Sequence, residues 1–231
     1  MLFDCGPGAG QNLMKVGISP TTIRRVFLTH LHMDHSLEFP SIVFGSYLIG
    51  RTDKWHLYGP SGTVNFSSLL FERVYPYAPE IVRKIRKEGL EVTPHEAPAG
   101  NVFENEKYRI SSAETEHGIP SFAYKIECRE GTVVISGDTR PSKSVIDLAR
   151  GADLLIHECS FPDDMIEFAR ETYHSVPSEV GDVANQAGVK KVVLTHLFPH
   201  CKGREMEMVK SVRSKFGGEV ISSHDLLEIN I

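Results

Sequence analysis

The stretch Thr29-His30-Leu31-His32-Met33-Asp34-His35 decides the fold of this 231-residue chain. Four potential metal ligands lie within six consecutive positions, directly after an apolar run of strand length. Imidazole and carboxylate groups suit zinc, and they also suit manganese or iron. On a turn, the first two histidines can reach one ion while Asp34 and His35 reach a second, and such ion pairs activate a bridging water. The stretch therefore predicts a dinuclear metal site and argues against a surface turn that happens to be rich in histidine.

Further ligand types follow other strand-like runs. Asp138 comes shortly after the run Thr132–Ser136, and His196 comes directly after Lys191–Thr195. His117 lies at the end of another expected strand. Each is weak by itself, because an Asp after a strand is commonly a helix N-cap and a strand-end His is commonly structural. Their joint occurrence with the histidine-rich stretch favours a shared metal site.

Strands and helices alternate along much of the chain. Strand-like runs rich in β-branched residues are separated by segments in which apolar residues recur at helical spacing. This alternation predicts α/β layering, and the lack of a linker or low-complexity segment predicts a single domain over residues 1–231. The expected strands are Arg25–Thr29, Thr132–Ser136, Asp153–Ile156, Lys191–Thr195 and one or two after Leu90; the expected helices follow Pro141–Ser142 or cover Phe66–Val74, Pro79–Glu88, Ser178–Ala187 and Arg204–Phe216.

Composition excludes several classes of protein. Hydrophobic residues at 41% and charged residues at 24% match an ordinary globular protein, which argues against disorder. A net charge of −5 offers no general attraction to nucleic acid, and the basic run Arg83–Lys87 is typical of a solvated helix face. The four cysteines form no C-x-x-C pair, so a cysteine-type zinc finger is excluded. No apolar stretch could span a membrane and no secretory signal is evident, so we expect a cytoplasmic protein.

Short motifs spread over nearly the whole chain resemble those of the metallo-β-lactamase superfamily. Within it, they are similar to the branch that contains ribonuclease Z and the arylsulfatase/phosphodiesterase-like hydrolases. The motifs are F-D-C-G at Phe3–Gly6, T-H-L-H-x-D-H at Thr29–His35, Y-G-P at Tyr58–Pro60, the His117 segment, S-G-D-T at Ser136–Thr139, H-E at His157–Glu158, His174-Ser175, and L-T-H at Leu194–His196.

The resemblance implies an αββα four-layer sandwich with two divalent metal ions, zinc first and Mn²⁺ or Fe²⁺ as alternatives. It assigns His30, His32 and His117 to the first metal, Asp34, His35 and His196 to the second, and Asp138 to a bridge. It further implies that Glu158 orients His174, which protonates a leaving oxygen, while Asp34 also positions the nucleophile. A Glu–His pair fixes the imidazole tautomer and raises its basicity, which suits general acid catalysis near neutral pH.

Two departures from the family pattern affect the expected function. The family has a strand pair before F-D-C-G, whereas this chain starts at Met1, and an uncovered sheet edge favours a homodimer. The common ribonuclease Z type also inserts a long flexible arm that grips the tRNA body. Here the corresponding strands are joined by Arg129-Glu130-Gly131, which leaves room only for a hairpin turn.

The leading hypothesis is therefore a metal-dependent phosphodiesterase that acts on small phosphodiesters through a metal-bridging hydroxide. A ribonuclease Z-type tRNA 3′-processing endonuclease without the arm is the first alternative, because the motifs of that branch are present. Arylsulfatase or lactonase activity is a further alternative, since the same hydroxide can attack sulfur or an acyl carbon. A non-enzymatic regulator is disfavoured, because a binding module needs neither seven metal-binding positions nor a Glu–His pair.

Overall fold

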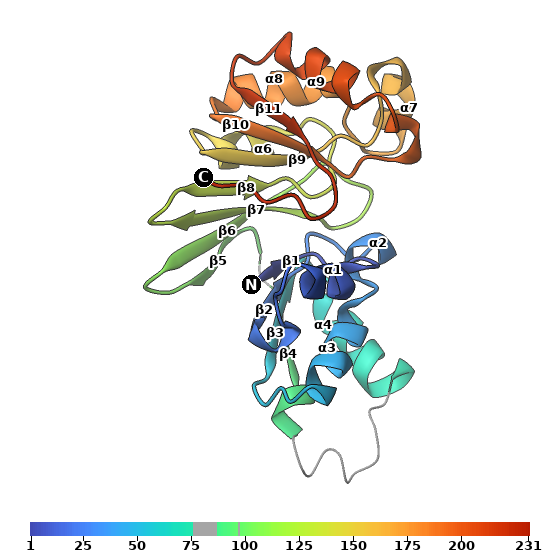
Figure 1. The fold of residues 1–231 in the computed structure, drawn as a ribbon, viewed down its shortest axis with the longest axis vertical. Helices are drawn as coiled ribbons and strands as arrows, with labels where there is room; N and C mark the ends of the chain where they lie inside the picture. Colours follow the sequence, from blue (N-terminus) through green and yellow to red (C-terminus); the bar gives the residue numbers. More distant parts are fainter. Residues whose placement is uncertain (76–86, 97) are drawn as a thin grey trace. The chain divides into compact units, whose positions relative to one another are not determined.

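The computed structural model describes residues 1–75, 87–96 and 98–231, which form two compact units, Met1–Pro98 and Ala99–Ile231 (Figure 1). Each unit consists of one β-sheet with helices packed against it. Most of the expected helix over Pro79–Glu88 and most of the basic run Arg83–Lys87 lie outside the described residues, and the last residues of that range belong to a 3₁₀ turn. Among the described residues, no helix has the length and apolar character needed to cross a membrane. The single-domain organisation stays a prediction.

The first unit contains a four-stranded parallel sheet in the order β1-β2-β3-β4. Side chains on one sheet face, including Leu28, Trp55 and Leu57, are buried with Phe39 and Val43 of a helix. Burial of this apolar surface stabilises the sheet that carries the histidine-rich stretch. The elements are β1 (Leu2–Phe3), α1 (Ala9–Lys15), β2 (Arg25–Phe27), α2 (Met33–Ser36), α3 (Phe39–Leu48), β3 (Trp55–Gly59), α4 (Thr63–Ser68), a π-helical segment (Leu69–Val74) and β4 (Val92–Glu96), with 3₁₀ turns at Pro20–Thr22 and Lys87–Leu90.

The second unit contains a seven-stranded mixed sheet in the order β11-β10-β9-β8-β7-β6-β5. The strands β5 to β8 pair antiparallel, whereas β8 to β11 pair parallel through helical crossovers. The elements are β5 (Gly100–Glu104), β6 (Tyr108–Glu114), β7 (Phe122–Cys128), β8 (Thr132–Ile135), α6 (Lys143–Ala149), β9 (Leu154–Glu158), α7 (Ile166–Glu171), α8 (Pro177–Ala187), β10 (Lys191–Thr195), α9 (Glu205–Arg213) and β11 (Glu219–Ser222), with 3₁₀ turns at Asp163–Met165 and Pro199–Cys201.

Helices α6, α8 and α9 cover one face of this sheet (Figure 1). Their buried side chains, such as Val180, Val183 and Met208, pack on Leu155 and Leu194 of the parallel strands. Continuous apolar runs in β9 and β10 are typical of parallel strands buried on both faces. Since the carboxyl ends of parallel strands meet at one edge of a sheet, the residues that follow β8, β9 and β10 are gathered there.

The described structure confirms most of the expected elements and corrects several bounds. The strand expected over Asp153–Ile156 runs on through Glu158, because Glu158 pairs in register with Thr195 of β10. The last helix ends at Arg213, and Phe216 packs into the core beyond it. The turn between β7 and β8 has three residues, as expected, so these strands carry no inserted arm.

Candidate metal and proton-transfer site

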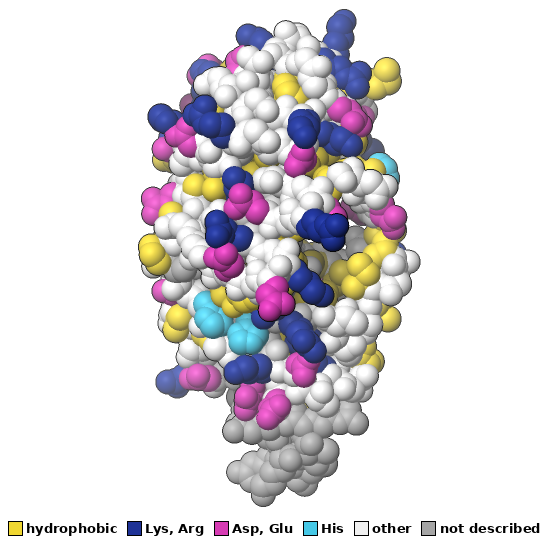
Figure 2. Space-filling view, turned by 90° about the vertical axis from the view of Figure 1, so that its left-hand side faces the viewer, with side chains coloured by type: hydrophobic (Ala, Val, Ile, Leu, Met, Phe, Trp, Pro, Cys, Tyr) yellow, Lys and Arg dark blue, Asp and Glu magenta, His cyan; other side chains and the backbone are white. Residues whose placement is uncertain are grey.

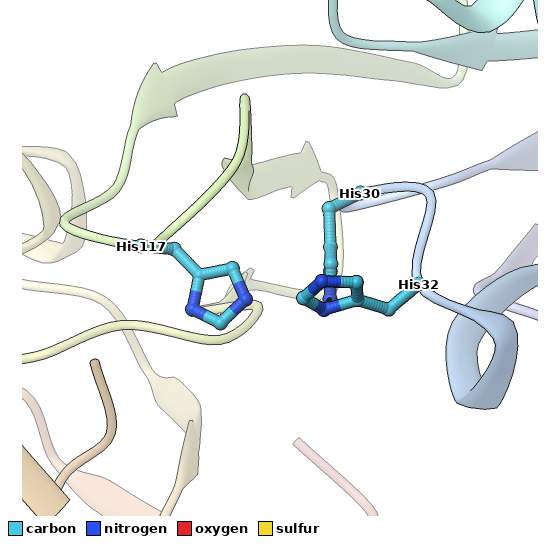
Figure 3. A group of neighbouring side chains, drawn as sticks. All are labelled: His30, His32 and His117. Atoms are coloured by element: carbon cyan, nitrogen blue, oxygen red, sulfur yellow. Dashed lines mark hydrogen bonds between the residues drawn. The ribbon is translucent and has the colours of Figure 1, made fainter. Parts of the chain in front are cut away.

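The histidine-rich stretch forms the loop after β2 and the short helix α2 in the first unit. His30 is buried, and its Nδ1 lies 3.0 Å from the Thr29 hydroxyl. The Nε2 atom of His30 lies 3.0 Å from Nδ1 of His32 (Figure 3). Helix α2 then places Asp34 and His35 side by side, with 3.8 Å between a carboxylate oxygen of Asp34 and Nε2 of His35. The structure therefore brings the four expected ligands of this stretch together.

Asp4, which follows β1, holds this loop in place. Its carboxylate accepts hydrogen bonds from the Thr29 backbone N–H at 2.7 Å and from the Thr29 hydroxyl at 2.8 Å. The same carboxylate lies 2.7 Å from Nδ1 of His35. A carboxylate on one ring nitrogen fixes the tautomer of a metal-ligating histidine and leaves the other nitrogen to the metal. Asp4 is thus a positioning residue that sequence analysis did not single out, although it belongs to the F-D-C-G motif.

Gly6 allows the backbone after Asp4 to lie very close to the backbone of Asp34 in the histidine-rich stretch. A Cβ atom on Gly6 would lie 1.7 Å from the backbone carbonyl oxygen of Asp34, which is an impossible contact. We expect Gly6→Ala to displace Asp34 and its loop, to cost about 1–3 kcal/mol of unfolding free energy, and to weaken metal binding. Thermal unfolding and metal titration measure both effects. Gly45→Ala in α3 is the matched control, because a Cβ there meets no atom within 4 Å; equal behaviour of the two variants would contradict the prediction.

In the second unit, Asp138 and His196 lie at the carboxyl edge of the parallel strands. Asp138 is 3% exposed, and its Oδ2 lies 3.6 Å from Nε2 of His196. The opposite ring nitrogen of His196 lies 2.8 Å from the hydroxyl of Ser160. The backbone turns sharply before Asp138, where Gly137 has a φ of 60°, a value that glycine adopts without strain.

His117 belongs to the same group of side chains in the second unit. Its Nδ1 lies 3.3 Å from the backbone oxygen of Tyr173, and the ring is shown in Figure 3. The ring centroids of His117 and His174 are 5.6 Å apart, and those of His174 and His196 are also 5.6 Å apart. Ligand atoms of Asp138, His174 and His196 lie within 4.8 Å of one another, close enough to hold a metal ion.

Glu158 and His174 form the expected pair. Nδ1 of His174 lies 3.0 Å from Oε1 of Glu158, whose side chain is 1% exposed. The Glu158 carboxylate also accepts hydrogen bonds from the backbone N–H groups of Thr139 and Ser175 and from the hydroxyl of Ser160. These donors fix the carboxylate, and the carboxylate in turn fixes the His174 ring with Nε2 directed away from Glu158.

The donor set fits divalent metal ions. In His30, His35, His117 and His196, Nδ1 contacts a hydroxyl, carboxylate or carbonyl oxygen of the protein, which leaves Nε2 as the ligand atom. Metal-ligating histidines almost always have such a partner on the second nitrogen. Ser160 and the Tyr173 carbonyl supply two of these partners. Neither partner could be predicted from the sequence, because neither residue type indicates such a role.

Two neighbouring groups are unsuited to metal binding. His157 is buried, desolvation lowers its pKa, and its Nδ1 lies 2.7 Å from the Glu158 backbone oxygen. It belongs to none of the groups of potential metal ligands among the described residues. Burial raises the pKa of the Cys159 thiol well above its ordinary value, and Glu158 adds to the effect. A thiol that stays protonated is a poor ligand and a poor nucleophile. Both residues therefore have structural roles.

A family model and solved structures show the protein superfamily to which this chain belongs. A family model described as beta-lactamase superfamily domain matches residues 1–197, so the chain belongs to the metallo-β-lactamase superfamily. The solved metallo-β-lactamase fold protein YhfI from Bacillus subtilis superimposes with a TM-score of 0.80, at 23% identity over 97% of this chain and 85% of that one. The short form of human tRNase Z gives 0.77, at 24% identity and the same coverage. The expected fold class is confirmed.

Relatives of similar sequence show the branch of the superfamily to which the chain belongs. Ribonuclease Z from Methanosarcina acetivorans is 31% identical over 280 aligned positions, which include all of this chain and 88% of the relative. Ribonuclease Z from Methanothermobacter thermautotrophicus is 30% identical over 263 positions, with 93% of this chain and 82% of the relative covered. The chain belongs to the ribonuclease Z branch of metal-dependent hydrolases.

Proposed function

We propose that this hydrolase is a ribonuclease Z-type endonuclease that removes the 3′ trailer from precursor tRNA. Identity of about 30% with enzymes named ribonuclease Z, along the whole chain, supports this assignment. The structural observation that carries it is the buried Glu158–His174 pair beside Asp138 and His196. This pair is placed to transfer a proton to a leaving oxygen, as cleavage of an RNA phosphodiester requires. The relatives thus favour the tRNA alternative over the small phosphodiester ranked first from the sequence.

We assign two divalent ions, with zinc as the first choice, to the seven ligands expected from the sequence. When bound, such ions activate water and stabilise the oxygens of the reacting phosphate. Asp34 positions the attacking water, since its half-exposed carboxylate can accept a hydrogen bond from it. The first ion is assigned to His30, His32 and His117, the second to Asp34, His35 and His196, and Asp138 is shared.

His174 supplies the proton in this scheme. Glu158 contacts Nδ1 of His174 at 3.0 Å and stabilises the protonated ring. A positively charged ring can donate from Nε2 to the ribose oxygen that leaves. After the transfer, the neutral ring keeps its orientation, because Glu158 still holds Nδ1.

A small phosphodiester remains the second candidate substrate. It is favoured by the three-residue turn between β7 and β8, where an arm would be inserted. The alignment of 280 positions with the Methanosarcina enzyme also exceeds the 231 residues of this chain, so that enzyme contains positions absent here. No described feature favours sulfate esters or lactones. The homodimer and the cytoplasmic location stay predictions.

The test is cleavage of a precursor tRNA with a 3′ trailer by zinc- or manganese-loaded protein. We expect a single cut at the trailer and two metal ions per chain by elemental analysis. Bis-p-nitrophenyl phosphate, p-nitrophenyl sulfate and a lactone serve as comparison substrates. Hydrolysis of the small phosphodiester with the precursor left intact would select the second candidate. One ion or fewer per chain after loading would contradict the ligand assignment.

A further inference from the structure

Arg140 and Tyr173 form a stacked pair next to the second unit's ligand cluster, which consists of His117, Asp138, His174 and His196. The guanidinium carbon of Arg140 lies 4.5 Å from the centre of the Tyr173 ring. The Arg140 side chain is 37% exposed, and Tyr173 as a residue is 39% exposed. The backbone N–H of Arg140 donates to the Glu116 carbonyl at 3.0 Å. The pair is thus fixed in position while it remains accessible to a ligand.

The pair is tied to the functional site through the chain itself. Arg140 is two residues after Asp138, and Tyr173 directly precedes His174. Tyr173 also has a φ of 64°, in the left-handed region that is unfavourable for an aromatic residue. Such strain persists only where the surroundings enforce it, and it concentrates at functional sites. In this conformation the Tyr173 carbonyl contacts Nδ1 of His117 while its ring supports Arg140.

The charge environment of Arg140 differs from that of three other arginines in this unit. Arg109, Arg150 and Arg204 each lie within 2.9 Å of a carboxylate oxygen. The Arg140 guanidinium lies 3.7 Å from the Glu116 carboxylate, which exceeds hydrogen-bonding distance. The planar guanidinium of Arg140 carries several N–H donors and is suited to bidentate contact with a phosphate.

RNA binding by this chain needs such local contacts. The net charge is −5, and Figure 2 shows a face on which basic and acidic side chains of the described residues are interspersed. Phosphate contacts nevertheless supply much of the affinity for a polynucleotide. Exposed basic side chains close to the site, such as Arg140, are suited to provide this part of the binding energy.

We propose that Arg140, supported by the Tyr173 ring, binds a phosphate of the RNA chain next to the scissile phosphate. The proposal rests on the proposed function and adds a recognition residue to it. The scissile phosphate itself is assigned to the metal ions. A guanidinium at the edge of the cluster then recognises the neighbouring nucleotide, so it distinguishes an RNA chain from an isolated phosphodiester.

The experiment compares Arg140→Gln with the control variant Arg150→Gln. Arg150 is an exposed arginine at the C-terminal end of α6, so the control removes the same charge at another place in the second unit. For precursor tRNA, we expect Arg140→Gln to raise KM by roughly 10–100-fold with little change in kcat, as for loss of a charged hydrogen-bonded contact. The dependence of log binding affinity on log salt concentration should become shallower by about one. Hydrolysis of bis-p-nitrophenyl phosphate and metal content should not change, and Arg150→Gln should resemble the wild type.

Two further variants separate binding from a structural role. Arg140→Lys should keep the salt dependence and recover part of the affinity for RNA, because it keeps the positive charge but lacks the planar guanidinium. Tyr173→Leu should raise KM less than Arg140→Gln, because it removes only the support of the guanidinium. Equal losses for precursor tRNA and bis-p-nitrophenyl phosphate, or an unchanged KM in Arg140→Gln, would overturn the proposal.

A different result would contradict the proposed endonuclease function itself. Wild-type protein that leaves precursor tRNA uncut would overturn the endonuclease assignment. In that case the affinity for a fluorescent trailer RNA, measured by anisotropy, tests Arg140 directly. Equal affinity of the wild type and Arg140→Gln, or no binding by either, would overturn the phosphate-binding role.

Discussion

Asp138→Ala should lose metal and lower the rate of bis-p-nitrophenyl phosphate hydrolysis by roughly 10³-fold or more, because the proposed ions would supply the nucleophile and stabilise charge. Asp138 is the residue assigned to both ions, and its buried carboxylate lies 3.6 Å from Nε2 of His196. Removal of a shared ligand weakens both sites together. Elemental analysis and steady-state kinetics on zinc-loaded protein measure the two effects.

Two variants provide controls for Asp138. His196→Ala should mainly reduce occupancy of the second ion, because His196 is assigned to that ion alone. Asp147→Ala removes an exposed carboxylate of α6 that pairs with Lys143 and Arg150, and it should leave metal content unchanged. Far-ultraviolet circular dichroism establishes that each variant is folded. A folded Asp138→Ala protein with full metal content and activity would refute the assignment of a shared ligand.

His174→Ala should keep both ions and still lower the rate by roughly 10²–10⁴-fold on substrates with a poor leaving group, the usual contribution of positioned proton transfer. The loss should be smaller for p-nitrophenyl esters, because that leaving oxygen needs little protonation. Glu158→Gln should show a weaker defect of the same kind, since it removes the charge that stabilises the protonated ring. The measurement is the ratio of rates for poor and good leaving groups in each variant.

Other outcomes would assign His174 differently. A ligand atom of His174 lies within 4.8 Å of ligand atoms of Asp138 and His196, so the ring is also close enough to bind metal. Loss of an ion in His174→Ala would make it a ligand. An unchanged leaving-group ratio with both ions present would show that His174 does not protonate the leaving oxygen.

The sequence predicted the elements whose signals are local. Apolar runs such as Lys191–Thr195 are strands because their side chains are buried on both faces. The proposed ligands His30, Asp138 and His196 were found because they follow the ends of such runs. The extension of β9 through Glu158 could not be predicted in this way. It depends on pairing with β10, which lies more than thirty residues further along the chain.

The positioning residues Asp4 and Ser160 could not be predicted from the sequence for a related reason. Asp4 contacts Thr29 across 25 residues of chain, and Ser160 contacts His196 across 36. A lone Ser or Asp has many ordinary roles, so its type carries little information about such a distant partner. The Arg140–Tyr173 stack likewise depends on a left-handed conformation at Tyr173, which no local pattern in the sequence indicates.

For the proposed endonuclease, the short turn between β7 and β8 would also determine which features of an RNA the enzyme can recognise. Contacts remote from the reacting bond allow a catalyst to use the overall shape of a large substrate for orientation. With only three residues at this point, the described chain has no extension there to measure that shape. In the proposed endonuclease, selectivity would then depend on the nucleotides next to the cut, and transcripts with similar 3′ ends would compete as substrates even when the rest of their structure differs.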